Sequence, residues 1–167
     1  MPTVRAAVEA DMLTLVDIYN AEVRGGISTF DTQPVTRDRF EGSLGTDHQG
    51  DHLLVAVEDG QVLGYASSHA YRPRPAYDGS REVSVYLHPA SRGRGVARAL
   101  YAVLLPLMAT SGVHTALAVV ALPNPASVAL HTSFGFAHVG TLQQVGHKFG
   151  RYIDTALYQL TFAAAGR

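Results

Sequence analysis

The sequence contains no cysteine, and this absence excludes three kinds of site. Without thiols the chain forms no disulfides, binds no metal through thiolates and has no cysteine nucleophile. The sequence also lacks any apolar run of membrane-spanning length, including over residues 1–5. We therefore expect a soluble, cytoplasmic protein with no membrane partner.

An excess of charge of either sign is missing as well. The chain has 13 Lys and Arg residues and 14 Asp and Glu residues, which give a formal net charge of −1. No overall positive field attracts nucleic acid, so we expect no nucleic-acid partner, and any phosphate group must be bound by a local arrangement. The eight histidines lie in different predicted elements and form no HExxH pair, so no metal site is expected.

The composition that remains is that of an ordinary globular protein. With 167 residues, of which 47% are hydrophobic and 16% charged, the chain can form one core, and we expect a single domain over residues 1–167. Apolar periodicity and turn signals predict a mixed α/β fold. The expected strands are 3–8, 53–57, 61–71, 82–88, 115–121, 138–145 and 152–162, and the expected helices begin near residues 11, 36, 95 and 124.

Three details of this prediction depend on single residues. Thr36 is expected to cap a short helix that carries Phe40 and Leu44. Pro106 falls inside the helix predicted at 95–110, where it should cause a kink or an early end. The last two strands are expected to be joined by a turn at residues 147–150.

The most informative segment is a strand that leads through a glycine-containing loop into a helix at residues 83–97. Gly93 and Gly95 lack side chains, so a ligand can approach the backbone closely. The first N–H groups of a helix have no internal partners and favour anions, and Arg92 and Arg94 add positive charge. The alternative is an ordinary surface turn with two solvated arginines. No GxxxxGK[ST] motif is present, and Arg98 stands where a dinucleotide-binding fingerprint requires glycine.

In these residues the chain resembles the GNAT acyltransferases. Arg92-x-x-Gly95-x-Ala97 is similar to their [QR]-x-x-G-x-[GA] signature, and residues 122–136 are similar to their second coenzyme A segment. The resemblance implies a central, mostly antiparallel twisted sheet of about seven strands, flanked by about four helices. It also implies acetyl-CoA as co-substrate, with its pyrophosphate on the loop amides. The implied contacts are Val85, Tyr86, Leu87, Arg92, Gly93, Arg94, Gly95, Val96, Ala97, Arg98, Asn124 and Ser127.

Four further segments resemble one branch, the phosphinothricin and methionine sulfoximine N-acetyltransferases. They are residues 27–30, 84–87, 122–124 and 146–152. This resemblance implies acetylation of the α-amino group of a glutamate-like or methionine-like analogue by a homodimer.

Two residues are predicted to manage protons, because acetyl transfer needs a neutral amine and an acceptor for its proton. Glu82, at the start of the strand before the loop, matches the catalytic glutamate proposed for the family; the alternative is a carboxylate paired with Arg81 or another neighbour. His131, in the last helix, titrates near neutral pH and could act as base or acid. Its alternative is a packed histidine bonded to backbone.

The acceptor is expected at the loop before Glu82. Arg72 and Arg74 are suited to a carboxylate, and by resemblance they and Tyr77 contact the substrate, with Thr29 and Phe30 lining its side-chain pocket. The alternatives are a solvated loop and a simple loop anchor. Two competing functions remain: an acyl-CoA-binding sensor without turnover, and acetylation of a protein N-terminus or a polyamine. The arginines argue against a polycationic acceptor.

Overall fold

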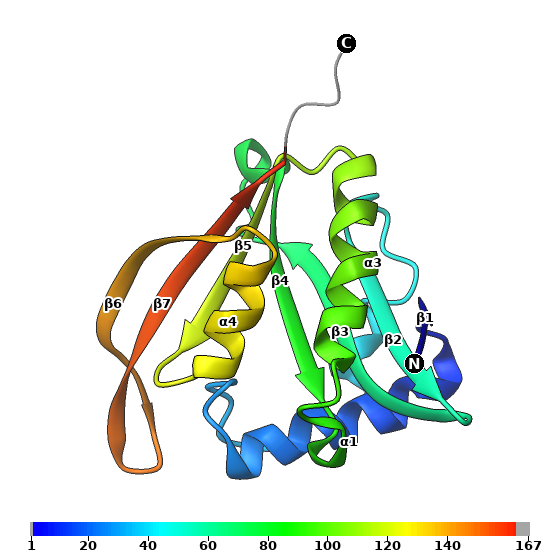
Figure 1. Cartoon of the computed structure of the whole chain (residues 1–167), viewed down its shortest axis with the longest axis horizontal. Helices are drawn as coiled ribbons and strands as arrows, with labels where there is room; N and C mark the ends of the chain where they lie inside the picture. Colours follow the sequence, from blue (N-terminus) through cyan, green and yellow to red (C-terminus); the bar gives the residue numbers. More distant parts are fainter. Residues whose placement is uncertain (1, 163–167) are drawn as a thin grey trace.

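The computed structural model describes residues 2–162 of the chain, and within them it forms one seven-stranded sheet with four α-helices (Figure 1). The sheet order is β1-β2-β3-β4-β5-β7-β6. The strands are β1 (Thr3–Ala6), β2 (His52–Glu58), β3 (Gln61–Ala70), β4 (Ser80–Leu87), β5 (Thr115–Ala121), β6 (Ala137–Lys148) and β7 (Arg151–Thr161). The helices are α1 (Met12–Gly25), α2 (Asp38–Glu41), α3 (Val96–Thr110) and α4 (Pro125–Ser133), with short 3-10 turns η1 (Glu9–Asp11), η2 (Pro75–Tyr77) and η3 (Pro89–Ser91). The expected mixed α/β fold is confirmed.

One pair of strands departs from the antiparallel pattern. β4 and β5 run parallel, and they pair only from Ser80↔Thr115 to Glu82↔Leu117. Beyond Glu82 the two strands separate, as Figure 1 shows, and the sheet is open between the second half of β4 and that of β5. The backbone edges that face this opening have no strand partner there, so their N–H and C=O groups can pair with a ligand.

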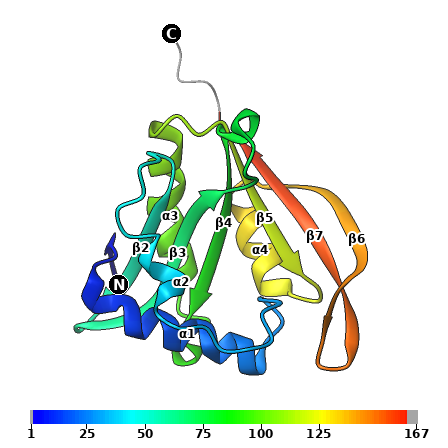
Figure 2. The ribbon, with the colours of Figure 1, turned by 180° about the vertical axis from the view of Figure 1, so that it is seen from behind.

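Helices cover both faces of the sheet. α3 and α4 lie on the face seen in Figure 1, and α1 and α2 lie on the opposite face, seen in Figure 2. Each face has its own core. Leu100, Leu104 and Met108 of α3 are fully buried in the first core, and Met12 and Leu15 of α1 are fully buried in the second. These residues recur at helical spacing, so the apolar stripe of each helix accounts for its packing.

The early end expected at Pro106 is wrong, because α3 continues to Thr110. Pro106 removes the N–H that would bond to the carbonyl of Ala102. Both residues are exposed, so water can satisfy that carbonyl and the helix does not have to end.

Two other local predictions need correction. The short helix α2 begins after Arg37 and not after Thr36, and it ends before Leu44, although Phe40 is buried as expected. The turn predicted at 147–150 is only Phe149-Gly150, since β6 extends to Lys148. Lys148 therefore belongs to a strand and is buried, which its charge did not suggest. No helix within residues 2–162 combines the length and apolar character needed to cross a membrane.

Candidate functional site

The opening between β4 and β5 holds a cavity of about 800 Å³. This volume is within the range of small-molecule and cofactor sites. The lining residues come from α1 and the loop after it (Ile18, Glu22, Gly26, Ile27, Ser28), from β4 (Val83, Ser84, Val85, Tyr86, Leu87), from β5 (Ala118, Val119, Val120, Ala121), from the start of α3 (Arg92, Gly93, Gly95, Val96, Ala97, Arg98, Tyr101) and from α4 with its N-cap (Asn124, Ala126, Ser127, Ala129, Leu130, His131, Ser133). The cavity thus touches elements from both faces of the sheet.

One end of the cavity is formed by the N-terminus of α3, whose backbone is suited to an anion. Gly93 and Gly95 have φ angles of 74° and 76°, and a Cβ at either position would project into open space. A side chain there would stand where a ligand approaches the loop, and the positive φ itself favours glycine. The first N–H groups of this 15-residue helix have no acceptor within it, and they sit at the positive end of its dipole.

The three arginines of this segment point in different directions. Arg92 donates to the Glu22 carboxylate at 2.9 Å, and Arg98 lies over the ring of Phe134 at the rim of the cavity. Arg94 instead pairs with Glu58 and lines a separate, smaller cavity of about 320 Å³. Of the twelve residues expected to bind the cofactor, all except Arg94 line the larger cavity.

The start of α4 forms another wall of the cavity. Asn124 caps this helix, because its Oδ1 accepts a hydrogen bond from the Ser127 N–H at 3.1 Å. Its Nδ2 reaches the Ser28 hydroxyl at 3.4 Å, which links α4 to the loop after α1. The cap and this contact hold α4 beside the opening.

His131 lines the cavity, yet both nitrogens of its ring are engaged inside the protein. Nδ1 lies 2.7 Å from the Ser127 carbonyl oxygen and Nε2 lies 3.0 Å from the Tyr101 hydroxyl. A carbonyl oxygen only accepts, so Nδ1 carries the proton and Nε2 accepts the hydrogen bond that Tyr101 donates. Burial lowers the pKa of His131, and the bond to Ser127 opposes this shift. The imidazole is therefore neutral at neutral pH.

Glu82 occupies the last paired position before β4 and β5 separate. Alternation along the strand places its side chain on the same face as Ser84 and Tyr86, the face covered by α1. The predicted alternative, pairing with Arg81, does not occur, because the buried Arg81 forms an ion pair with Asp51 at 2.9 Å. Within residues 2–162 the carboxylate of Glu82 has no hydrogen bond or salt bridge, so it is free to act on a ligand.

The arginine loop lies at the η2 turn, at the end of β4 where Glu82 is located. Arg72, Arg74 and Tyr77 are exposed and do not line the large cavity. Tyr71 organises this loop, since its ring contacts both the Tyr77 ring and the Arg72 guanidinium. The pKa of Arg72 is raised first by a hydrogen-bond interaction with Tyr71 and, among weaker contributions, by the charge of Glu82. Arg72 thus interacts electrostatically with Glu82, without a hydrogen bond or salt bridge between the two side chains.

Thr29 and Phe30 belong to the loop after α1, in which the preceding Ser28 accepts from Tyr86 near the other end of β4. The Thr29 hydroxyl is 2.6 Å from the Tyr19 hydroxyl and accepts from the Asp31 N–H at 3.1 Å, so it anchors the loop. The Phe30 ring covers Gly146. Neither residue lines the large cavity, whereas the preceding Ile27 and Ser28 do.

Two residues that shape this region, Tyr101 and Glu22, were not predicted from the sequence. Lys148 was predicted in the turn at residues 147–150, but its burial was not. Glu22 was detectable, since it stands one turn after Ile18 and Tyr19 on the apolar face of α1, where a carboxylate requires a partner. Within residues 2–162, no three His, Asp or Glu side chains converge into a group that could hold a metal.

Known proteins resemble the chain over most of its length. The acetyltransferase (GNAT) family matches residues 15–136. The phosphinothricin N-acetyltransferase of Streptomyces coelicolor is 45% identical over 93% of this chain and 94% of its own. The L-methionine sulfoximine/L-methionine sulfone acetyltransferase of Salmonella typhimurium is 36% identical over 95% and 93%. A phosphinothricin acetyltransferase from Sinorhizobium meliloti, solved in complex with AcCoA, superimposes with a TM-score of 0.92 at 34% identity, over 97% and 89%.

The burial of His131 generates a prediction about its titration. Because its pKa is lowered, the imidazole should stay neutral as the pH falls, and it should titrate below the ordinary value of about 6.5. NMR of ¹⁵N-labelled protein, with His131→Gln to assign the signal, should show a protonated Nδ1 and an unprotonated Nε2. A midpoint at or above 6.5, or the opposite tautomer, would contradict the assignment.

Proposed function

This chain is a member of the acetyltransferase (GNAT) family, and we propose that it transfers the acetyl group of acetyl-CoA to the α-amino group of a small amino-acid analogue. The acceptor class we infer is that of phosphinothricin, methionine sulfoximine and methionine sulfone. The names of the Streptomyces and Salmonella relatives support this class. The transfer is direct, within a complex that contains both substrates.

The observation that carries the proposal is the cavity that crosses the sheet where β4 and β5 separate. On the α3 side it ends at unpaired helix N–H groups above Gly93 and Gly95, which suit the pyrophosphate of acetyl-CoA. On the α1 side it is bounded by Ser28, whose carbonyl accepts from the Tyr86 hydroxyl. Two substrates that enter from opposite faces would therefore meet at the opening in the sheet.

Acetyl-CoA would supply an activated acetyl group with a thiolate leaving group, so the protein has to orient the substrates and accept a proton. The free edges of β4 and β5 can orient an extended ligand by backbone hydrogen bonds. Arg92, Arg98 and the loop amides would hold its phosphates. Arg94, which pairs with Glu58, is proposed only for the outer rim of that site.

We assign the proton-accepting role to Glu82. Glu82 lies at the start of the opening with its side chain on the α1 face, and within residues 2–162 its carboxylate has no hydrogen bond or salt bridge. It can accept the proton of the attacking amine directly or through one water molecule. His131 can take the predicted acid–base role only when its Nε2 releases the Tyr101 hydroxyl and binds the substrate instead. Because Glu82 needs no such exchange, we propose His131 as the second proton carrier, after Glu82.

The carboxylate of the acceptor is proposed to bind at the η2 turn. Arg72 lies near Glu82, and an amino acid presents its carboxylate beside the reacting amine, so one molecule can engage both residues. Arg74 and Tyr77 complete this end of the proposed site. Thr29 and Phe30 are proposed to support the acceptor side chain through the loop that carries Ser28.

An assay of free CoA release tests the proposed function. With acetyl-CoA, we expect turnover with phosphinothricin, methionine sulfoximine or methionine sulfone, and none with polyamines or peptide N-termini. Turnover confined to peptides or polyamines would refute the acceptor class. Tight binding of acetyl-CoA without release of CoA, for any acceptor in the panel, would refute the enzymatic activity and favour a sensor.

The role of Glu82 is tested by Glu82→Gln, which keeps the size of the side chain but removes the base. Turnover should fall by roughly 10²- to 10⁴-fold, the usual contribution of a general base. The affinity for acetyl-CoA, measured by calorimetry, should stay within about twofold because Glu82 does not line the large cavity. An equal loss of acetyl-CoA affinity would show that the residue acts on the fold instead.

We also propose that the enzyme is a homodimer formed through the β6–β7 hairpin. Large apolar side chains gather there with about half or more of their surface exposed, namely Val139, Leu142, Val145, Phe149 and Tyr152. β6 is also one of the two edge strands of the sheet. An exposed apolar edge of this length pairs readily with another chain, and a second copy offers a matching surface.

Light scattering after size exclusion should then give twice the mass of the 17.8 kDa chain. Val145→Asp places a charge in the proposed interface and should shift the protein toward the monomer. Leu13→Asp puts the same charge in place of an exposed apolar side chain on α1, outside the hairpin, and serves as the control. A wild-type protein that is monomeric at micromolar concentration would contradict the proposal.

A further inference from the structure

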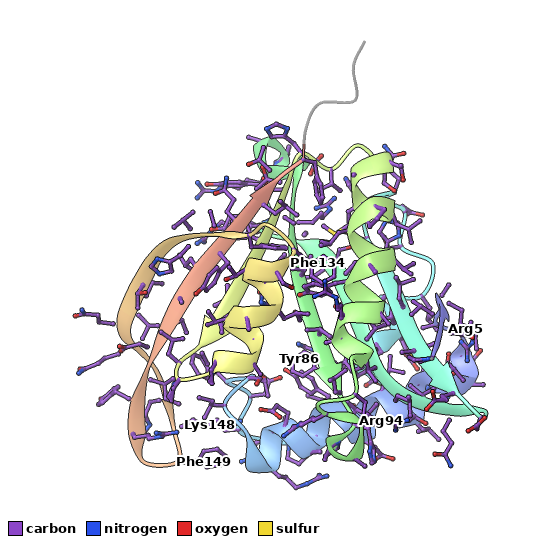
Figure 3. All side chains as sticks on the ribbon, viewed as in Figure 1. Arg5, Tyr86, Arg94, Phe134, Lys148 and Phe149 are labelled. Carbon is purple, nitrogen blue, oxygen red and sulfur yellow. The ribbon has the colours of Figure 1, made fainter. Side chains whose placement is uncertain are left out.

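The least expected residue of the structure is Lys148, at the end of β6. Its side chain is 3% exposed, although lysine is almost never fully buried without partners. Its ammonium group donates to three backbone carbonyls: Gly26 at 2.8 Å, Thr29 at 2.9 Å and Glu22 at 3.3 Å. The three N–H donors of the ammonium are thus all used, and all bind the end of α1 and the loop after it. In Figure 3, Lys148 lies beside this part of the ribbon.

The carbonyls that Lys148 binds bracket a wall of the cavity. Gly26 and Thr29 stand on either side of Ile27 and Ser28, and these two residues line the cavity. The carbonyl of Ser28 accepts from the hydroxyl of Tyr86, a β4 side chain on the α1 face. Lys148 therefore holds both ends of the segment that closes the cavity on that face.

A carboxylate binds the same segment. Glu22 directs one carboxylate oxygen to the Ser28 N–H at 3.0 Å and the other to Arg92 at 2.9 Å. The wall is thus bound by a carboxylate from α1 and by an ammonium from β6. Loss of either group would leave buried polar atoms of the wall without partners, which is destabilising.

A second residue of β6 supports the same loop. Gly146 lies two positions before Lys148, so the two share one face of the strand. A Cβ at Gly146 would lie 2.2 Å from Cζ of Phe30, because the ring fills the space that the missing side chain leaves. The hairpin therefore contacts the loop at its backbone, through Lys148, and at its Phe30 side chain, through Gly146.

We propose that Lys148 is a positioning residue for the acceptor and that, together with Gly146, it makes the β6–β7 hairpin a determinant of acceptor specificity. The inference rests on the proposed function, in which the acceptor enters from the α1 face. Acetyl-CoA is held by the opposite end of the cavity, at the N-terminus of α3. The hairpin should thus act on one substrate and leave the other nearly unaffected.

Lys148→Met tests the backbone contact, since methionine matches much of the length and removes the donors. We expect the KM for methionine sulfone to rise at least tenfold, the KM for acetyl-CoA to stay within twofold, and kcat to change less than the acceptor KM. Arg151→Met is the matched control, because Arg151 pairs with Lys148 across the hairpin but is exposed. It should leave all three constants unchanged.

Gly146→Ala provides a second test that keeps Lys148 in place. Its backbone does not need positive φ, so the added methyl group acts by displacing the Phe30 ring. The acceptor KM should again rise without a change for acetyl-CoA. Hydrogen exchange adds a readout that needs no turnover: the amides of residues 27–31 should exchange faster in Lys148→Met than in wild type, and those of β4 should not.

The outcomes separate this inference from the proposed function. A wild-type enzyme that acetylates no amino-acid analogue refutes the function, and hydrogen exchange then decides whether Lys148 holds the loop. If the wild type is active and both variants keep its KM for the acceptor, the inference is refuted while the proposed function stands. Equal rises in the KM for both substrates, or unchanged exchange at residues 27–31, would also overturn it.

Discussion

The rest of the structure depends on the short parallel pairing between β4 and β5. Only three residues of each strand are paired, and beyond Glu82 the strands diverge. This divergence leaves backbone groups without partners at the centre of a sheet, where they are normally all satisfied. It also joins the two faces of the molecule through one cavity, so that α3 and α4 approach it from one side and α1 from the other.

The two predicted proton carriers differ because the cavity gives them different environments. His131 is buried, and its hydrogen bonds to Ser127 and Tyr101 keep it neutral with one defined tautomer. Glu82 is partly exposed, and its carboxylate has no bond or salt bridge within residues 2–162. A free carboxylate beside an arginine can accept a proton from an incoming amine, whereas an engaged imidazole must first exchange a partner.

Much of the site could be predicted because its signals are local. The anion site follows from glycines before a helix, a pattern that depends only on backbone conformation and on the unpaired N–H groups of one turn. The position of Glu82 near the start of a strand also followed from local signals. The environments of Lys148 and Tyr101 could not be predicted, because their partners lie 119 to 126 and 30 residues away in the sequence. No periodicity reports a contact between elements so far apart.

The sequence by itself determined the mixed α/β order and the glycine-containing loop before a helix at residues 92–97, which depend on the conformational preferences of neighbouring residues. Glu82 and His131 were predicted as proton carriers from the resemblance to the family. Only the tertiary structure decided that Arg94 turns away to Glu58, that both nitrogens of His131 are engaged, and that a lysine of β6 holds the loop after α1. These outcomes depend on which charged groups and carbonyls become neighbours when the sheet forms. They also depend on burial, because a buried polar or charged group without a partner is destabilising.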